Sequence, residues 1–292
     1  MSAVDTREID DQAAPADRRD ERAGGGGAVR PRRRPAAFSV VSWALGLVLL
    51  VFVAAPLVAL VTGTSLHEFL STIGEADVRQ ALATSVEAAV LATVLACIGG
   101  VPLAYLLARR DFPGKRLVEG LIDLPIVFPH TAAGIALLLV FGRSGVFGRG
   151  FAHLGVAFTD TLAGIVVAMM FVSLPFLVDT AREAFALIDP GYEQVARTLG
   201  ATPGSAFARV ALPLARRGVL AGALLMWARG MSEFGAIVIL AYNPKTMSVL
   251  VYERFEGLGL DAAKPAALLI VLLALAVFIV VRATAGRRGV QP

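Results

Sequence analysis

The chain contains five long apolar stretches without a single Asp, Glu, Lys or Arg, and a sixth that carries only two charges. A helix needs roughly 20 apolar residues to cross the hydrocarbon core of a bilayer, within a range of about 17–25. The uncharged stretches hold 17 to 23 residues and lie at 40–62, 88–108, 124–141, 162–178 and 265–281. The sixth, 218–242, is long enough to span but contains Arg229 and Glu233. We therefore predict six transmembrane helices.

Composition agrees with this prediction. The chain is 57% hydrophobic and 17% charged, whereas soluble domains average about 45–50% apolar and about 25% charged residues. Such runs in lipid must satisfy their own backbone hydrogen bonds as helices, so we predict an all-α polytopic membrane protein. The one cysteine, Cys97, lies within an apolar run. It has no partner for an intramolecular disulfide and no cluster with zinc spacing around it, and we expect no metal site.

The distribution of Lys and Arg between the predicted loops sets the orientation. With the N-terminus inside, the inner segments carry 16 basic residues near the spans and the outer segments carry six. The inner positions are Arg30, Arg32, Arg33, Arg34, Arg109, Arg110, Lys115, Arg116, Arg182, Arg197, Arg209, Arg216, Arg217, Arg282, Arg287 and Arg288; the outer ones are Arg79, Arg143, Arg149, Lys245, Arg254 and Lys264. By the positive-inside rule both termini are predicted to be cytoplasmic. The net charge of +4 is then a topology signal, and we expect no nucleic-acid partner.

The ends of the chain differ from its middle. Residues 1–38 are rich in Asp, Arg, Ala and Gly and have almost no large apolar residues, a composition typical of disorder. The apolar run that follows is too long for a cleaved signal peptide. We predict a disordered cytoplasmic tail over 1–38, a membrane domain over 39–284 and a short cytoplasmic tail over 285–292. The predicted location is the cell membrane, crossed several times.

The longest inner loop, residues 179–217, has the pattern of two short helices. Asp, Pro and Gly at 189–191 break the preceding helix, and helix-forming residues at 192–199 end at Gly200, the residue best suited to a left-handed C-terminal position. Thr202-Pro203 then forms an N-cap and first-turn pair, and Pro213 predicts an end or a kink. Two short rigid helices suit docking into a groove of another protein; an ordinary amphipathic loop is the alternative.

This loop resembles a signature of the permeases of binding-protein-dependent ABC importers, which reads Glu-Ala-Ala, three residues, Gly, nine residues, then Ile-x-Leu-Pro. The matching positions are Gln194, Val195, Ala196, Gly200, Val210, Leu212 and Pro213. Gln194 replaces the motif Glu and Val195 the first Ala, while Glu193 precedes them; a salt bridge expected from the motif Glu is therefore open. The resemblance implies a type I importer permease fold, in which this segment docks into an ATPase subunit and transmits its closure.

The same resemblance implies partners and site residues. We expect an ABC ATPase dimer that holds ATP and Mg, an extracytoplasmic oxyanion-binding protein and a second copy of this chain, all working at the lipid bilayer. The residues assigned to ATPase coupling are Glu193, Gln194, Ala196, Gly200, Ala201, Thr202, Leu212 and Pro213.

Two further segments resemble oxyanion importers. Residues 123–142 are similar to the third span of oxyanion-importer permeases, and residues 228–260, with their Ala-Tyr-x-Pro-Lys-Thr stretch, are most similar to the molybdate/tungstate branch. The resemblance implies import of molybdate or tungstate, with sulfate or thiosulfate as the alternative ion.

Charged and polar residues inside predicted spans are candidates for the transport route. Arg229 and Glu233 lie four residues apart and would share one helical face. Intramembrane charges face a bundle interior or a watery cavity, so they either line or gate the route or form an ion pair that stabilises packing. His130, after Pro129, is predicted to pack inside the bundle beside a kink, and a metal role is disfavoured because no second ligand is near.

Other classes of protein fit less well. The sequence lacks His-Glu-x-x-His, Gly-x-Ser-x-Gly and a Walker A motif, since Gly114-Lys115 has no glycine at the required spacing before it. We therefore predict no catalytic residue in this chain and ATP hydrolysis in a separate subunit. A proton-coupled secondary transporter could use Glu233 as a relay, but it would need neither an ATPase nor a docking loop.

Overall fold

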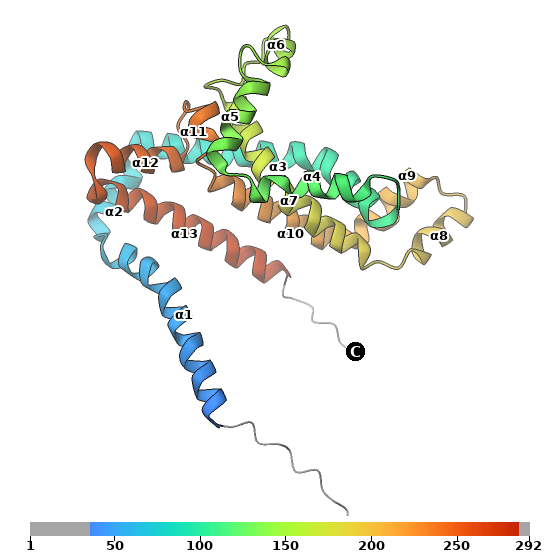
Figure 1. The fold of residues 1–292 in the computed structure, drawn as a ribbon, viewed down its shortest axis with the longest axis horizontal. Helices are drawn as coiled ribbons and strands as arrows, with labels where there is room; N and C mark the ends of the chain where they lie inside the picture. The colour runs from blue at the N-terminus through green and yellow to red at the C-terminus, as the bar shows by residue number, and fades with distance from the viewer. Residues whose placement is uncertain (1–35, 286–292) are drawn as a thin grey trace, which may run out of the picture. The chain divides into compact units, whose positions relative to one another are not determined.

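The computed structural model describes residues 36–285, with side chains from 38 to 279. Every regular element in this range is a helix, which confirms the all-α class (Figure 1). The helices are α1 (Ala36–Thr62), α2 (Leu66–Gly74), α3 (Ala76–Arg109), α4 (Lys115–Val127), α5 (His130–Phe141), α6 (Val146–Ala152), α7 (Leu162–Ala186), α8 (Gly191–Thr198), α9 (Pro203–Ala206), η1 (Phe207–Ala211), α10 (Leu212–Met231), α11 (Ile237–Leu240), α12 (Met247–Leu258) and α13 (Leu260–Ala285).

Five helical runs within the described residues are long and apolar enough to cross a membrane. They are α1, α3, α7, the α9–α10 run over 203–231, and α13. The α4–α5 pair adds a sixth if it is counted as one broken span. The prediction of six spans is confirmed in this sense.

The chain divides into two compact units, residues 1–54 and 55–292. In the first unit the structure describes the uncharged first part of α1. At 27 residues, the whole of α1 is about 40 Å long at 1.5 Å per residue, enough to cross a bilayer. The predicted tails, 1–38 and 285–292, and the basic run 30–34 lie outside the described residues, apart from the first turn of α1 and the last residue of α13.

Helices α3, α7 and α10 pack side by side and form the core of the second unit (Figure 1). The buried face of α3 carries small residues three or four positions apart, which let helix backbones approach closely in lipid; they are Ala81, Ser85, Ala88, Ala92, Ala96, Gly100 and Ala104. Helices α7 and α10 meet at Gly218, where an added Cβ would lie 2.2 Å from Cβ of Ala184.

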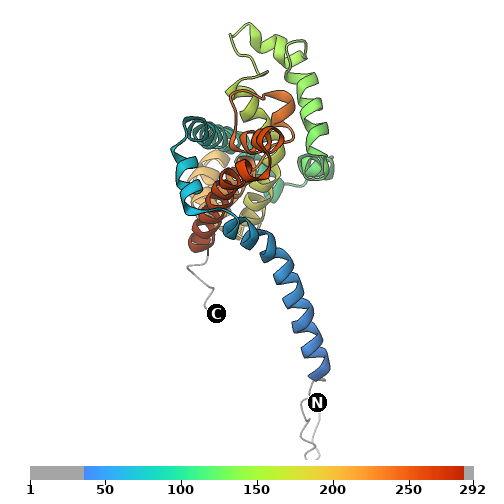
Figure 2. The same ribbon diagram turned by 90° about the vertical axis from the view of Figure 1, so that its left-hand side faces the viewer.

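Helices α12 and α13 pack together and contact α3 and α2 (Figure 2). A smaller apolar cluster joins them, with Val78 and Ala81 from α3, Met247 and Leu250 from α12, and Ala266 from α13. This packing places α2, the start of α3, α12 and the start of α13 around one charged cavity.

The third predicted span, 124–141, is not one straight helix. Helices α4 and α5 are bent by 118° at Phe128–Pro129. Pro129 has no N–H to continue the hydrogen-bond ladder, and a residue before proline is driven out of the helical region. Phe128 accordingly takes extended angles, φ −73° and ψ 129°. Residues 124–141 are continuously apolar, but Pro129 divides them between two helices.

The fifth predicted span, 218–242, is displaced along the chain. The helix begins at Pro203 and ends at Met231, so that the segment from Ser232 to Gly235 leaves the helix before the single turn of α11. Glu233 Oε1 accepts a hydrogen bond from the backbone N–H of Ala236 at 2.9 Å. A side chain that accepts a backbone N–H three residues further on competes with continuation of the helix, and this bond accompanies the break.

Candidate functional site

The connection between α7 and α10 holds the helix–glycine–helix arrangement predicted from sequence. Helix α8 ends at Thr198, and Gly200 follows with φ +92°. The N–H of Gly200 donates to the carbonyl of Arg197, and that of Ala201 donates to the carbonyl of Ala196, both at 3.0 Å. These two bonds form a Schellman motif, in which the left-handed residue is usually glycine. The predicted turn is therefore confirmed.

The second short helix also begins where predicted. Thr202 is the N-cap of α9, its hydroxyl accepting the N–H of Ser205 at 3.2 Å, and Pro203 occupies the first turn. A cavity of about 480 Å³ separates this turn from the end of α8 and is lined by residues that include Ala196, Gly200 and Thr202.

Pro213 was expected to end or kink the helix; the predicted end is wrong, and the backbone distortion next to the proline is a π-helical turn. Leu212 and Pro213 lie in the first turn of α10, and the helix runs on without a stop from α9 to Met231. Directly before them, Phe207–Ala211 is a π-helical turn. The wider i→i+5 ladder of such a turn relaxes the backbone where proline, which has no N–H, would otherwise break it.

Glu193 supplies the contact that the motif position left open. Its side chain is buried against the end of α3, where Oε1 accepts from Arg109 Nε at 2.8 Å and Oε2 accepts from the Tyr105 hydroxyl. The Glu193 and Arg109 side chains are each only 10% exposed. The ring of Tyr105 packs 5.4 Å from that of Phe185 on α7 and 4.8 Å from that of Phe207 on η1. One acidic side chain thus fastens α8 to α3, through a tyrosine whose ring also packs against α7 and η1.

Gln194, at the motif Glu position, is exposed, and the salt bridge to Arg109 is formed by the preceding residue, Glu193. The sequence reasoning missed Tyr105 and Arg109. The sequence feature that could have identified them is their spacing: they are polar, lie four residues apart at the end of an apolar run and therefore share one helical face.

The three candidates His130, Arg229 and Glu233 come together in one contact. Arg229 Nη2 lies 3.1 Å from Glu233 Oε2 and 3.1 Å from His130 Nε2, while His130 Nδ1 lies 3.4 Å from the same Glu233 oxygen. The Glu233 side chain is 2% exposed, that of Arg229 23% and that of His130 47%. A buried carboxylate is therefore neutralised by a guanidinium, and an imidazole closes the contact on its open side.

Two details differ from expectation. Arg229 is in the last turn of α10 and Glu233 is beyond its end, so they do not share a continuous helical face, although the predicted ion pair forms. His130 is not packed inside the bundle but begins α5 as a half-exposed residue. Gly235 allows this approach, because an added Cβ there would lie 2.7 Å from Cβ of His130.

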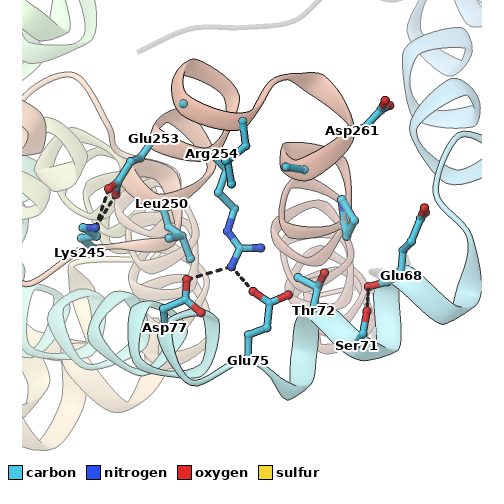
Figure 3. A pocket seen from close by; sticks show the side chains of 14 residues that line it. Glu68, Ser71, Thr72, Glu75, Asp77, Lys245, Leu250, Glu253, Arg254 and Asp261 are labelled. Atoms are coloured by element: carbon cyan, nitrogen blue, oxygen red, sulfur yellow. Dashed lines mark hydrogen bonds and ion pairs between the residues drawn. The ribbon is translucent and has the colours of Figure 1, made fainter.

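A charged cavity of about 580 Å³ lies among α2, the start of α3, α12 and the start of α13 (Figure 3). Arg254 reaches across it to the carboxylates of Glu75 and Asp77, 2.9 Å from the latter, and Lys245 Nζ lies 2.6 Å from a carboxylate oxygen of Glu253. The Glu253 hydrogen bond raises the pKa of Lys245. No sequence motif predicts this cavity, because its walls come from segments more than 170 positions apart.

Residues 100–287 match the family described as binding-protein-dependent transport system inner membrane component. The molybdate/tungstate transport system permease protein of Thermococcus kodakarensis is 40% identical over 248 residues, covering 84% of this chain and 95% of the relative. The sulfate transport system permease protein of Salmonella typhimurium is more distant, 32% identical over 241 residues, with 80% and 87% covered.

A solved structure shares the fold. The bacterial alginate ABC transporter, crystallised in complex with an alginate pentasaccharide-bound periplasmic protein, contains a chain that aligns with a TM-score of 0.69 and 16% identity. The alignment covers 87% of this chain and 97% of that one. At this identity the likeness concerns the fold alone.

Proposed function

This chain belongs to the family of binding-protein-dependent transport system inner membrane components, and from that membership we propose that it is the membrane-spanning permease of an ABC importer for molybdate or tungstate. The 40% identity to a molybdate/tungstate permease over nearly its full length carries the choice of ion, against 32% for a sulfate permease. Selectivity resides mainly in the external binding protein that delivers the ion. A secondary transporter does not bind an ATPase, so it would not need the docking loop that carries the family signature.

The ATPase subunit docks on the α7–α10 connection. Gly200 and its Schellman motif turn α8 back toward α9, which produces a short rigid projection of the kind that fits a groove. ATP and Mg belong to that partner. Closure of the ATPase dimer pushes on α8, and the Glu193 contact passes this movement to α3 and α7. The residues assigned to coupling by sequence lie in α8, in the turn that follows it and in the first turn of α10.

Two copies of the chain enclose the path. His130 and Arg229 are open on the surface of a single copy, and six helices leave little room for a gated pore. A second copy facing this surface would enclose the contact. There Arg229 offers an attractive but partly neutralised charge, and weak attraction is what passage requires, since a strong site would slow release.

The orientation follows from the basic residues. Both termini face the cytoplasm, which places the α7–α10 connection inside and the charged cavity of Figure 3 outside, on the side where a binding protein arrives. The lining of that cavity holds more acidic than basic side chains, so it discourages free oxyanions and leaves entry to delivery by the binding protein.

Replacement of Gly200 with valine tests the coupling role. Valine at φ +92° is strained, because β-branched residues avoid the left-handed region. We expect ATP hydrolysis to continue while binding-protein-dependent uptake falls. Gly204→Val is the matched control, because Gly204 lies in a helix and has open space beside it. Uptake that is unchanged by Gly200→Val, in a transporter that still holds its ATPase, would exclude the coupling role.

The ion is tested on the partner binding protein. Molybdate and tungstate should raise its melting temperature, and sulfate should not. Protection by sulfate alone would assign this chain to the sulfate importers, and proton-driven uptake without any ATPase would assign it to the secondary transporters.

A further inference from the structure

The imidazole of His130 lies over the guanidinium of Arg229. Arg229 Nη2 is 3.1 Å from Nε2 and 3.4 Å from Nδ1 of the ring. An N–H aimed at the lone pair of one ring nitrogen would lie in the plane of the ring and well away from the other nitrogen. Nearly equal distances to both nitrogens therefore place the guanidinium against the ring face, a stacking arrangement that Arg favours with aromatic rings. His130 thus covers Arg229 on one side.

Of the three side chains in this contact, His130 is the one that can leave. Glu233 is 2% exposed, and its two oxygens are held by the N–H of Ala236 at 2.9 Å and by Arg229 at 3.1 Å. The His130 side chain is 47% exposed, and within residues 38–279 its polar side-chain contacts are with Arg229 and Glu233 alone. An ion that approaches Arg229 from the open side would therefore displace the imidazole rather than the carboxylate.

His130 and Arg229 belong to different packed units of the bundle. Arg229 is in the last turn of α10, whereas His130 begins α5, which packs on α11. This packing is close at Gly134, where an added Cβ would lie 3.1 Å from Cα of Ala236. Two non-helical joints flank the α5–α11 pair, the bend between α4 and α5 and the break between α10 and α11. Changes of backbone angle at such joints would move α5 and α11 together relative to α10.

We propose that His130 is a lid on Arg229: the ring covers the guanidinium in this structure, and a shift of α5 and α11 relative to α10 uncovers it for the passing oxyanion. The inference rests on the proposed function for the class of ion. The uncovered guanidinium offers paired N–H donors, which suit the oxygens of a tetrahedral oxyanion. Glu233 stays paired with Arg229 in both positions, so the uncovered site remains weak, as passage requires. His130 acts through Arg229 and is a positioning residue.

The test uses the assembled transporter, permease with ATPase, in lipid nanodiscs without binding protein or nucleotide. Equilibrium dialysis measures the affinity for tungstate. His130→Ala removes the ring, whereas His130→Phe keeps an aromatic face without ring nitrogens. His153→Ala is the control, since His153 is an exposed histidine at the end of α6.

A triple variant shows whether Arg229 receives the ion. His130→Ala combined with Arg229→Gln and Glu233→Gln removes the ion pair as a whole, so that no buried charge is left without its partner. We expect His130→Ala to bind tungstate about tenfold more tightly than wild type, the gain expected from one hydrogen bond to a charged group. The His130→Phe, His153→Ala and triple variants should stay within about twofold of wild type.

Three results would overturn the inference. Equal affinity of wild type and His130→Ala would show that the ring does not cover the site. A gain in affinity that persists in the triple variant would place the ion elsewhere. Tight binding by His130→Phe would show that a ring nitrogen, and not the ring face, restrains Arg229.

Uptake separates the lid from the proposed function. Wild-type transporter with its binding protein and ATP should accumulate molybdate or tungstate whether or not His130 is a lid. If uptake fails, the proposed function fails; if uptake persists and dialysis shows no difference between the variants, only the lid is wrong. The maximal uptake rate of His130→Ala should fall, because a tighter site releases its ion more slowly. His130→Phe should keep the wild-type rate.

Discussion

Replacement of Glu193 with glutamine removes the charge that holds α8 against α3. Glutamine keeps the shape of the side chain and retains an oxygen for one donor, so the change isolates the ionic part of the contact. Arg109 is left buried, with a neutral partner at Nε and, among the residues that the structure describes, no partner at Nη2. Since the opposing side chains are both 10% exposed, solvent can compensate little of this loss.

The size of the effect follows from the burial of the pair. Breaking a buried ion pair by removing one partner costs about 3–5 kcal/mol. Because glutamine preserves one neutral hydrogen bond, we expect the lower end, about 3 kcal/mol. At about 1.4 kcal/mol for each factor of ten, detachment of α8 from α3 becomes roughly 150-fold more frequent.

Hydrogen exchange of the α8 amides measures this directly. Amides that exchange when α8 detaches should do so about 150-fold faster in Glu193→Gln, and uptake for each ATP hydrolysed should fall. Gln194→Ala is the control: the neighbouring side chain is exposed, and surface substitutions change stability by less than about 0.5 kcal/mol. The exchanged pair, Glu193→Arg with Arg109→Glu, should restore part of the loss. Equal exchange rates in Glu193→Gln and Gln194→Ala would refute the role of this contact.

Three further changes test other parts of the structure. Arg229→Gln leaves its buried carboxylate partner without the guanidinium, so it should lower the free energy of unfolding of the purified chain, measured by thermal denaturation, by about 3–5 kcal/mol. An unfolding free energy equal to wild type would exclude a tight pair. Gly218→Ala puts a methyl group 2.2 Å from its neighbour on α7 and should cost about 1–3 kcal/mol, whereas Gly99→Ala, which has open space, should be neutral or stabilising in the same thermal assay. Hydrogen bonds from the backbone and then the side chain of Ser65 lower the pKa of Glu68 below 4.5, so protection of the α2 amides should be full above pH 4.5 and be lost as the pH falls through the lowered value. Ser65→Ala keeps the backbone N–H and should reduce that pH dependence, whereas Glu68→Gln should abolish it.

Local rules predicted the α7–α10 connection well. The left-handed turn at Gly200 and the N-cap at Thr202 depend on chemistry within a few residues, and the structure places both as expected. The partners of Glu193 could not be read in this way, because Arg109 is 84 positions away and reaches α8 only once α3 and α7 have packed.

Hydropathy located the spans but not their interruptions. A window of apolar residues has the same score whether or not its backbone is continuous, so residues 124–141 were predicted as one helix across Pro129. At Pro213 the error was the reverse: the sequence suggested a break, and the structure has a π-helical turn that keeps the helix continuous. A proline alone predicts a break, yet one extra residue in the turn lets the helix run through.

The two spans that depart from a regular helix or from their predicted bounds are interrupted at the same place. The first breaks just before His130, and the second ends between Arg229 and Glu233, so both interruptions surround the three-residue contact. Where the backbone leaves a helix inside a membrane protein, its free N–H and C=O groups must bond to other groups or face a water-filled cavity. Polar side chains provide such bonds, and a route for an ion needs polar side chains as well. Glu233 does both: it accepts the backbone N–H of Ala236 through Oε1 and pairs with Arg229 through Oε2. A span that fails as a regular helix is therefore where the polar chemistry of this chain concentrates, and the proposed path for the oxyanion passes there.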